Sequence, residues 1–100
     1  MSEAPNSDVF MSRVDSLLKA AAAAISPLGA GIVVAIDMGI PDSRSFARAL
    51  GVEHALVLRE IAELSGPDGL ITITARHEKT LRTSLALSAR GALLLRERCS

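Results

Sequence analysis

Residues 42–64 constrain the fold of this chain more than any other segment. They read as two short amphipathic segments separated by Gly51, with Ala47 four residues before the glycine and Val57 six residues after it. Two helices that cross steeply need a small residue at the crossing, a glycine that can adopt a positive φ in the turn, and an apolar residue between them. The spacing therefore predicts a helix-turn-helix motif, which also occurs in proteins that never touch DNA.

The composition limits the chain to one domain and disfavours one class of ligand. The 100 residues are 49% hydrophobic, which is enough for a single core. Apart from two phenylalanines the apolar residues are aliphatic, and there is no tryptophan or tyrosine on which unpaired bases could stack. We therefore expect no binding to single-stranded nucleic acid.

Basic side chains are concentrated near the end of the chain, although the formal net charge is +0. Residues 1–41 and residues 42–64 are each slightly acidic, whereas residues 74–98 contain six lysines or arginines and two glutamates. An excess of positive charge attracts nucleic acid and other anions. An anion-binding surface is therefore expected mainly in the last third of the chain.

Several functional classes lack their usual sequence signals. Cys99 has no second cysteine for an internal disulfide, no apolar run reaches the roughly 18–20 residues of a membrane span, and residues 1–8 do not resemble a secretory signal. Neither His54 nor His77 has further ligands at metal-binding spacing, and the sequence has no catalytic triad, phosphate-binding loop or paired carboxylate cluster. We expect a cytoplasmic protein that is not an enzyme, has no cofactor or metal and binds no membrane.

The N-terminal part of the chain predicts a flexible arm over residues 1–7, followed by a single domain over residues 8–100. Ser7 or Asp8 can cap a first helix, because apolar residues then recur at intervals of three and four. An alanine run extends this helix and can pack on the protein's own core or on a second copy of the chain. The apolar positions are Phe10, Val14, Leu17, Leu18, Ala21 and Ile25.

Ser26 followed by Pro27 predicts the start of a second helix, because serine caps free N–H groups and proline suits the first helical position. The β-branched residues between 32 and 36 instead favour a buried strand. We favour a helix over residues 27–38, because Gly39 can terminate it and the helix-turn-helix segment needs a helix on which to pack.

The spacing of the apolar residues changes after the helix-turn-helix segment. Asp42 can cap a helix over residues 43–50, and a second helix is expected over residues 53–64. Beyond a turn, the period falls to two and predicts strands at 70–75 and 81–87, joined by a polar, basic tip that we expect to be mobile. The two helices are expected to bury Phe46, Ala47, Leu50, Val57, Ile61 and Leu64.

Ser88 can cap a final short helix over residues 89–98, with Leu87 placed to contact Ala92. The three leucines at 93–95 cover more than one face of this helix, so they pack against the first helix or against a partner chain. Three helices, a two-stranded wing over residues 70–87 and a short C-terminal helix make a mainly α fold with a small β-hairpin (α+β). This is a winged helix-turn-helix.

Residues 25–95 resemble the core of MarR-type regulators. The resemblance is carried by F-A-R-A-L-G-V at residues 46–52, by G-L after the second helix of the motif, and by L-S-A-R-G-A-L-L at residues 87–94. It implies a homodimer that binds double-stranded DNA and regulates transcription, with each recognition helix in a major groove and each wing along a minor groove. A small-molecule effector is compatible with the resemblance, but no residue pattern supports one.

The resemblance places the DNA-facing positions of the recognition helix on Glu53, His54, Leu56, Leu58 and Arg59. Arginine can pair with guanine or phosphate, and protonated histidine can donate a hydrogen bond. The start of the preceding helix can meet phosphate through its side chains and outward N–H groups. The predicted DNA-binding residues are Ser43, Arg44, His54, Arg59, Arg76, His77, Lys79 and Arg82.

Two features of the sequence leave an alternative open. Leu56 and Leu58, together with Glu53, give the recognition helix an apolar and acidic character, which favours a winged-helix module that binds protein or dimerises without reading DNA. The arginines of the helix-turn-helix can also form solvent-exposed ion pairs with neighbouring glutamates. Because the chain ends soon after the wing, a homodimer would depend on the first helix and the C-terminal leucines.

Overall fold

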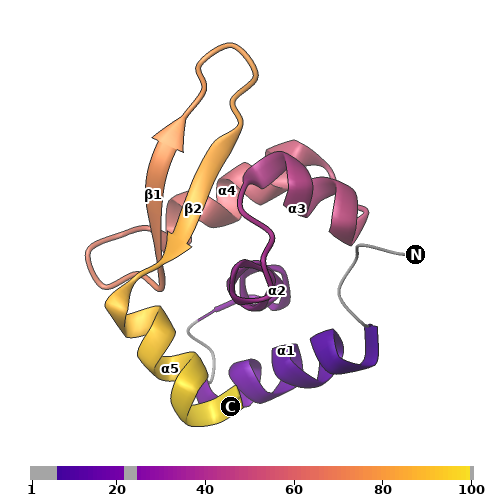
Figure 1. Ribbon diagram of the computed structural model, residues 1–100, viewed down its shortest axis with the longest axis vertical. Helices are drawn as coiled ribbons and strands as arrows, with labels where there is room; N and C mark the ends of the chain where they lie inside the picture. The colour runs from indigo at the N-terminus through magenta and orange to yellow at the C-terminus, as the bar shows by residue number, and fades with distance from the viewer. Residues whose placement is uncertain (1–6, 22–24, 100) are drawn as a thin grey trace.

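The computed structural model describes residues 7–21 and 25–99, which form a winged-helix-like α+β fold (Figure 1). This confirms the fold class predicted from the sequence, although four helices precede the wing among the described residues instead of the three stated. Of the predicted arm, only Ser7 is described, and it is the first residue of a helix. In chain order the elements are α1 (Ser7–Ala21), α2 (Pro27–Asp37), α3 (Ser43–Leu50), α4 (His54–Leu64), β1 (Ile71–Arg76), β2 (Thr83–Leu87) and α5 (Ala89–Cys99).

Helix α2 lies at the centre of the molecule. Figure 1 shows it end-on, with the other helices and the hairpin arranged around it, and every residue from Gly29 to Ala35 is buried. Burial of a valine or isoleucine side chain stabilises by about 1.5–3 kcal/mol, whereas its helix propensity is at most about 0.7 kcal/mol worse than that of alanine. The predicted helix is therefore confirmed over the alternative strand.

The ends of α2 are fixed by the residues that the sequence indicates. The Ser26 hydroxyl accepts a hydrogen bond from the Gly29 N–H (2.9 Å) and donates one to Glu60 of α4 (2.8 Å). The helix ends at Asp37, one residue earlier than predicted, and Gly39 follows with φ of 102°. The cap of α2 therefore also fixes the position of α4.

Helix α1 packs against α2 and α5 through the buried residues Val14 and Leu17. Its described part ends at Ala21, and residues 22–24 of the alanine run lie outside the described residues. The prediction that Ile25 belongs to this helix is wrong: Ile25 lies in a bend before α2 and packs against the core. The capping signal of the next residue, Ser26, requires extended backbone there.

The helix-turn-helix has the predicted arrangement. The side chain of Asp42 accepts a hydrogen bond from the Ser45 N–H at the start of α3 (2.9 Å), and Gly51 ends this helix with φ of 68°. Burial is confirmed for Phe46 and for Val57, Ile61 and Leu64 of α4. Ala47 and Leu50 are only partly buried.

The wing is the hairpin of β1 and β2 with its tip, residues 77–82. The strands pair antiparallel, and Thr74 forms a bulge because Ile73 pairs with Leu85 and Ala75 pairs with Ser84. Strand β2 begins two residues later than predicted. The reason is that Leu81 has φ of 60°, a backbone conformation that no strand residue adopts.

Helix α5 closes the domain against the base of the wing. Its cap, Ser88, accepts a hydrogen bond from the Gly91 N–H (3.0 Å) and donates one to the Gly69 carbonyl (2.7 Å), as its predicted capping role requires. Of the three leucines, Leu95 is buried, Leu94 is partly buried and Leu93 is exposed. These different exposures agree with leucines that cover more than one helix face.

Gly91 allows the close approach of α5 to the wing, and this generates a prediction. A Cβ atom at this position would lie 2.0 Å from the Leu70 carbonyl oxygen, so Gly91→Ala forces the backbones apart. We expect a loss of about 1–3 kcal/mol in unfolding free energy, measured by urea denaturation. Gly66→Ala is the matched control, because its Cβ would meet nothing within 4 Å. Equal stability of the two variants would contradict the prediction.

Candidate nucleic-acid interface

The start of α3 is attached to the beginning of β2 by backbone contacts. The Leu85 N–H donates a hydrogen bond to the Pro41 carbonyl (2.9 Å), and Asp42 and Ser84 form an antiparallel bridge. The segment before α3 therefore acts as a short third strand beside β2. We call the contacts between residues 41–44 and residues 80–85 the wing anchor.

Ser43 lies at the centre of the wing anchor and is 0% exposed. Its hydroxyl oxygen accepts a hydrogen bond from the N–H of buried Thr83 (2.9 Å) and lies 2.7 Å from Nε2 of His54. The prediction that the Ser43 side chain contacts DNA phosphate is therefore wrong. The hydroxyl instead connects α3 with His54 of α4 and Thr83 of β2.

His54, the first residue of α4, is half-buried beside this serine. Burial, followed by the positive charge of Arg44, lowers the pKa of His54 below its ordinary value of 6.5, and Asp42 acts in the opposite direction. The ring is therefore neutral at pH 7. Because Nε2 lies against Ser43, a contact between His54 and a base would have to use Nδ1.

Asp42 adds an electrostatic contact to the wing anchor. Besides its bond from the Ser45 N–H, its carboxylate accepts one from the Ser45 hydroxyl (3.2 Å). The Nε atom of Arg82 lies 3.7 Å from the same carboxylate, and 55% of the Arg82 side chain is exposed. Arg82 is thus oriented by the anchor while most of its surface faces solvent.

Arg44 connects α3 to the wing tip. Its Nη2 donates a hydrogen bond to the Thr80 carbonyl (2.9 Å), and the Thr80 hydroxyl lies 3.3 Å from Nδ1 of His77 and accepts a bond from the Arg82 N–H (3.2 Å). The tip is also closed by a bond from the Leu81 N–H to the His77 carbonyl (2.7 Å). Three predicted DNA-binding residues, Arg44, His77 and Arg82, are therefore brought to one surface.

Arg59, Arg76 and Lys79 lie apart from these contacts. All three are exposed, and within the described part of the chain none of their side chains forms a hydrogen bond or an ion pair. The same holds for Arg48, so pairing of the helix-turn-helix arginines with glutamate is not found among residues 7–21 and 25–99. Their charges are available to an anionic partner.

The two leucines of the recognition helix lie in different environments. Leu56 is 45% exposed, but Leu58 is partly buried against the core, so its predicted exposure is wrong. Sequence reasoning missed Leu81, which is 50% exposed because its positive φ points the chain away from the strand. A hollow of about 240 Å3 between α4 and the wing is lined by Leu58, Ile61, Ala62, Arg76, Leu81 and Thr83.

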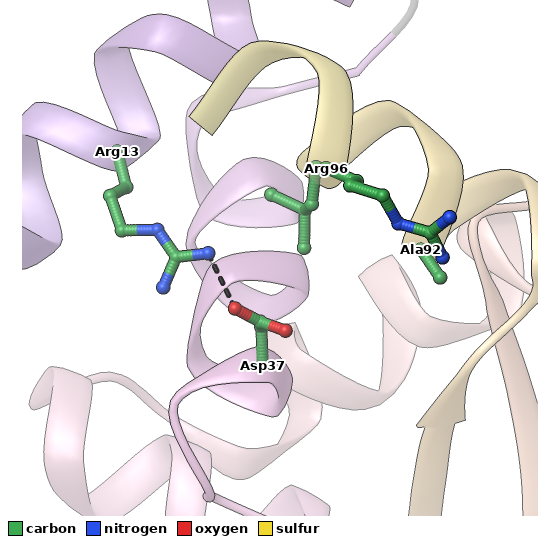
Figure 2. Close-up of a pocket in the computed structure, with 5 residues that line it drawn as sticks. Arg13, Asp37, Ala92 and Arg96 are labelled. Atoms are coloured by element: carbon green, nitrogen blue, oxygen red, sulfur yellow. Dashed lines mark hydrogen bonds and ion pairs between the residues drawn. The ribbon is translucent and has the colours of Figure 1, made fainter. Parts of the chain in front are cut away.

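A second hollow, of about 260 Å3, lies between α1, α2 and α5 (Figure 2). Arg13 of α1 forms an ion pair with Asp37 at the end of α2, while Arg96 directs its guanidinium away from this pair. No sequence pattern indicates the pair, because its members are 24 positions apart. The hollow presents charges of both signs, so it has no clear preference for an anion or a cation.

No protein-family model matches the chain, and no curated protein matches it significantly.

Within residues 7–21 and 25–99 there is no group of three or more acidic, histidine or cysteine residues that could hold a metal ion. None of the described helices combines the length and the hydrophobicity needed to cross a membrane.

The buried position of Ser43 generates a stability prediction. Ser43→Ala leaves the buried Thr83 N–H without its acceptor, and we expect a loss of about 1–3 kcal/mol in unfolding free energy. Ser65→Ala is the control, because that hydroxyl makes only an exposed 3.5 Å contact and should change stability by less than about 0.5 kcal/mol. Chemical denaturation of both variants tests this. A Ser43→Ala protein as stable as the wild type would contradict the role of the Ser43 hydroxyl as the acceptor for the Thr83 N–H.

Proposed function

We propose that this protein binds double-stranded DNA as a winged helix-turn-helix transcriptional regulator of the MarR type, in the cytoplasm. The observation that carries the proposal is the basic surface of the wing. Arg76 and Lys79 are exposed without ion pairs among the described residues, and Arg44 and Arg82 are oriented by the wing anchor. Positive groups that converge from two elements suit a curved row of phosphates.

In this proposal the recognition helix contributes fewer contacts than the wing. Arg59 is exposed on α4 and can pair with guanine in the major groove, while Leu56 can touch a thymine methyl group. Glu53, at the N-cap of α4, can accept a hydrogen bond from cytosine but repels phosphate. Ser43 and His54 support the interface from within and do not form part of it.

The proposed regulator is a homodimer that associates through α1 and α5. These helices contact each other at the end of the molecule opposite the wing tip, where α5 runs from the base of the wing towards α1 (Figure 1). Val9 and Met11 of α1 and Leu93 of α5 are each about half exposed. Exposed apolar side chains on these two helices support an arrangement in which both wings remain accessible to DNA.

A protein-binding module is the second candidate. Leu56 and Leu81 are exposed, and the hollow between α4 and the wing has mainly apolar walls. An apolar surface at the expected DNA-contacting face is typical of a site for a protein partner. Duplex binding distinguishes the two candidates, because this module has no need of phosphate contacts.

The wing residues predict how DNA affinity depends on salt. About four phosphate contacts per protomer give a slope in log affinity against log salt of about −3.6 per protomer, or about −7.2 for the dimer, and Arg76→Ala with Lys79→Ala should reduce the magnitude of the dimer slope by about 3.6. The measurement is fluorescence anisotropy of a labelled random duplex. Arg90→Ala with Arg96→Ala removes the same charge from α5 and should leave the slope unchanged. Absence of duplex binding by the wild-type protein at low salt would refute the proposed function.

Arg59 predicts a change in sequence preference. Arg59→Ala should remove about 1–3 kcal/mol of discrimination at one base pair, because a bidentate arginine distinguishes guanine from the other bases. Binding-site selection from a randomised duplex library, performed for wild type and variant, measures this change. Arg48→Ala provides the control, since Arg48 is an exposed arginine near the end of α3. Identical selected sequences for wild type and Arg59→Ala would mean that Arg59 does not read a base.

A further inference from the structure

One buried hydroxyl connects α3, α4 and β2. The Ser43 oxygen is shared between the Thr83 N–H, at 2.9 Å, and Nε2 of His54, at 2.7 Å. Ser43 and Thr83 are almost completely buried, so water does not replace either partner. Each contact therefore depends on the hydrogen atoms that these three residues can supply.

The number of hydrogen atoms fixes the protonation state that fits this site. A serine hydroxyl has one hydrogen to donate and two lone pairs to accept with, and a backbone N–H can only donate. Because Ser43 accepts from Thr83, its own hydrogen can be donated to Nε2 of His54. This requires Nε2 to carry no proton, which assigns the ring proton of neutral His54 to Nδ1.

Protonation of His54 disturbs this arrangement. Both ring nitrogens then carry protons, so Nε2 and the Thr83 N–H both direct a donor at the Ser43 oxygen. The serine hydrogen must turn away from its acceptor inside a buried site, which is unfavourable. The two lone pairs of the Ser43 oxygen can accept both donors, but the buried serine hydrogen is left without an acceptor, and this destabilises the site that positions the beginning of β2.

The charged side chains around His54 shift its pKa in opposite directions. Arg44, from α3, faces the ring and, after burial, is the second cause of the lowered pKa of His54. Asp42 favours the protonated ring, but its carboxylate also accepts from Ser45 and lies beside Arg82 of the wing. The balance favours the neutral ring in the folded protein.

We propose that Ser43 and His54 are positioning residues that hold the base of the wing against α4 while His54 is neutral and release it when His54 is protonated. The inference deepens the proposed function and rests on it only for the effect on DNA affinity. Since Thr83 follows Arg82 directly, release at Thr83 also moves an arginine of the basic surface. Mild acid thus loosens the wing from the recognition helix.

The direction of the pH effect on stability follows from linkage. The folded protein has a lower pKa at His54 than the unfolded chain, whose value is about 6.5. The unfolded state therefore binds the proton more readily, and stability rises with pH between the two values. The contribution of His54 is fully present above about pH 6.5 and is lost as the pH falls through the lowered pKa.

The test is the hydrogen-exchange protection of the Thr83 amide, followed by NMR between about pH 5 and 8 alongside the His54 ring resonances. We expect protection to fall by about five- to a hundredfold as His54 protonates, the range that loss of one buried hydrogen bond produces. His54→Gln keeps an acceptor that does not titrate, so its protection factor should be independent of pH. His77→Gln, which alters the exposed histidine of the wing tip, should retain the wild-type profile.

Two results would overturn the inference. The first is a wild-type Thr83 protection factor that stays constant across the titration of His54, a measurement that requires no variant. The second is a pH-dependent protection factor in folded His54→Gln protein. Neither measurement contains DNA, so a failure here leaves the proposed function standing, and absence of duplex binding leaves the positioning role standing.

Discussion

The wing anchor is the interaction on which the position of the wing depends. A two-stranded hairpin is only marginally stable by itself, so its orientation must come from contacts with the helices. In this protein the contacts lie between residues 41–44 and residues 80–85 and combine a backbone bridge, a buried serine, an ion pair and an arginine hydrogen bond. Helix α3 and the start of β2 are consequently held together.

The fold was largely predictable from the sequence because its decisive signals are local. Ser26, Asp42 and Ser88 each cap a helix from the residue before it, and Gly51 alone supplies the positive φ between α3 and α4. The boundaries of the wing strands were harder to predict from the sequence. Strand β2 starts late because Leu81 adopts a positive φ, and that conformation depends on hydrogen bonds across the tip and not on local propensity.

The candidate site was predicted less well, and the reason is distance along the chain. Ser43 looked like a phosphate-binding residue because it starts a helix, but its partner Thr83 lies 40 positions away. The family resemblance placed His54 on the reading face, and nothing near it in the sequence indicates its contact with a buried serine. Arg59, Arg76 and Lys79 are exposed as their prediction requires, because a charged side chain needs no distant partner in order to face solvent.

The basic residues of the proposed interface fall into two groups with different energetic roles. Arg44 and Arg82 are held by the wing anchor, so a ligand that meets them loses little additional side-chain entropy. Arg76 and Lys79 have no such restraint, and ordering a long basic side chain costs up to about 2 kcal/mol. The anchored pair is therefore suited to fix the orientation of a bound duplex, and the unrestrained pair to adapt to its phosphates. Any change in the anchor, including protonation of His54, acts first on orientation.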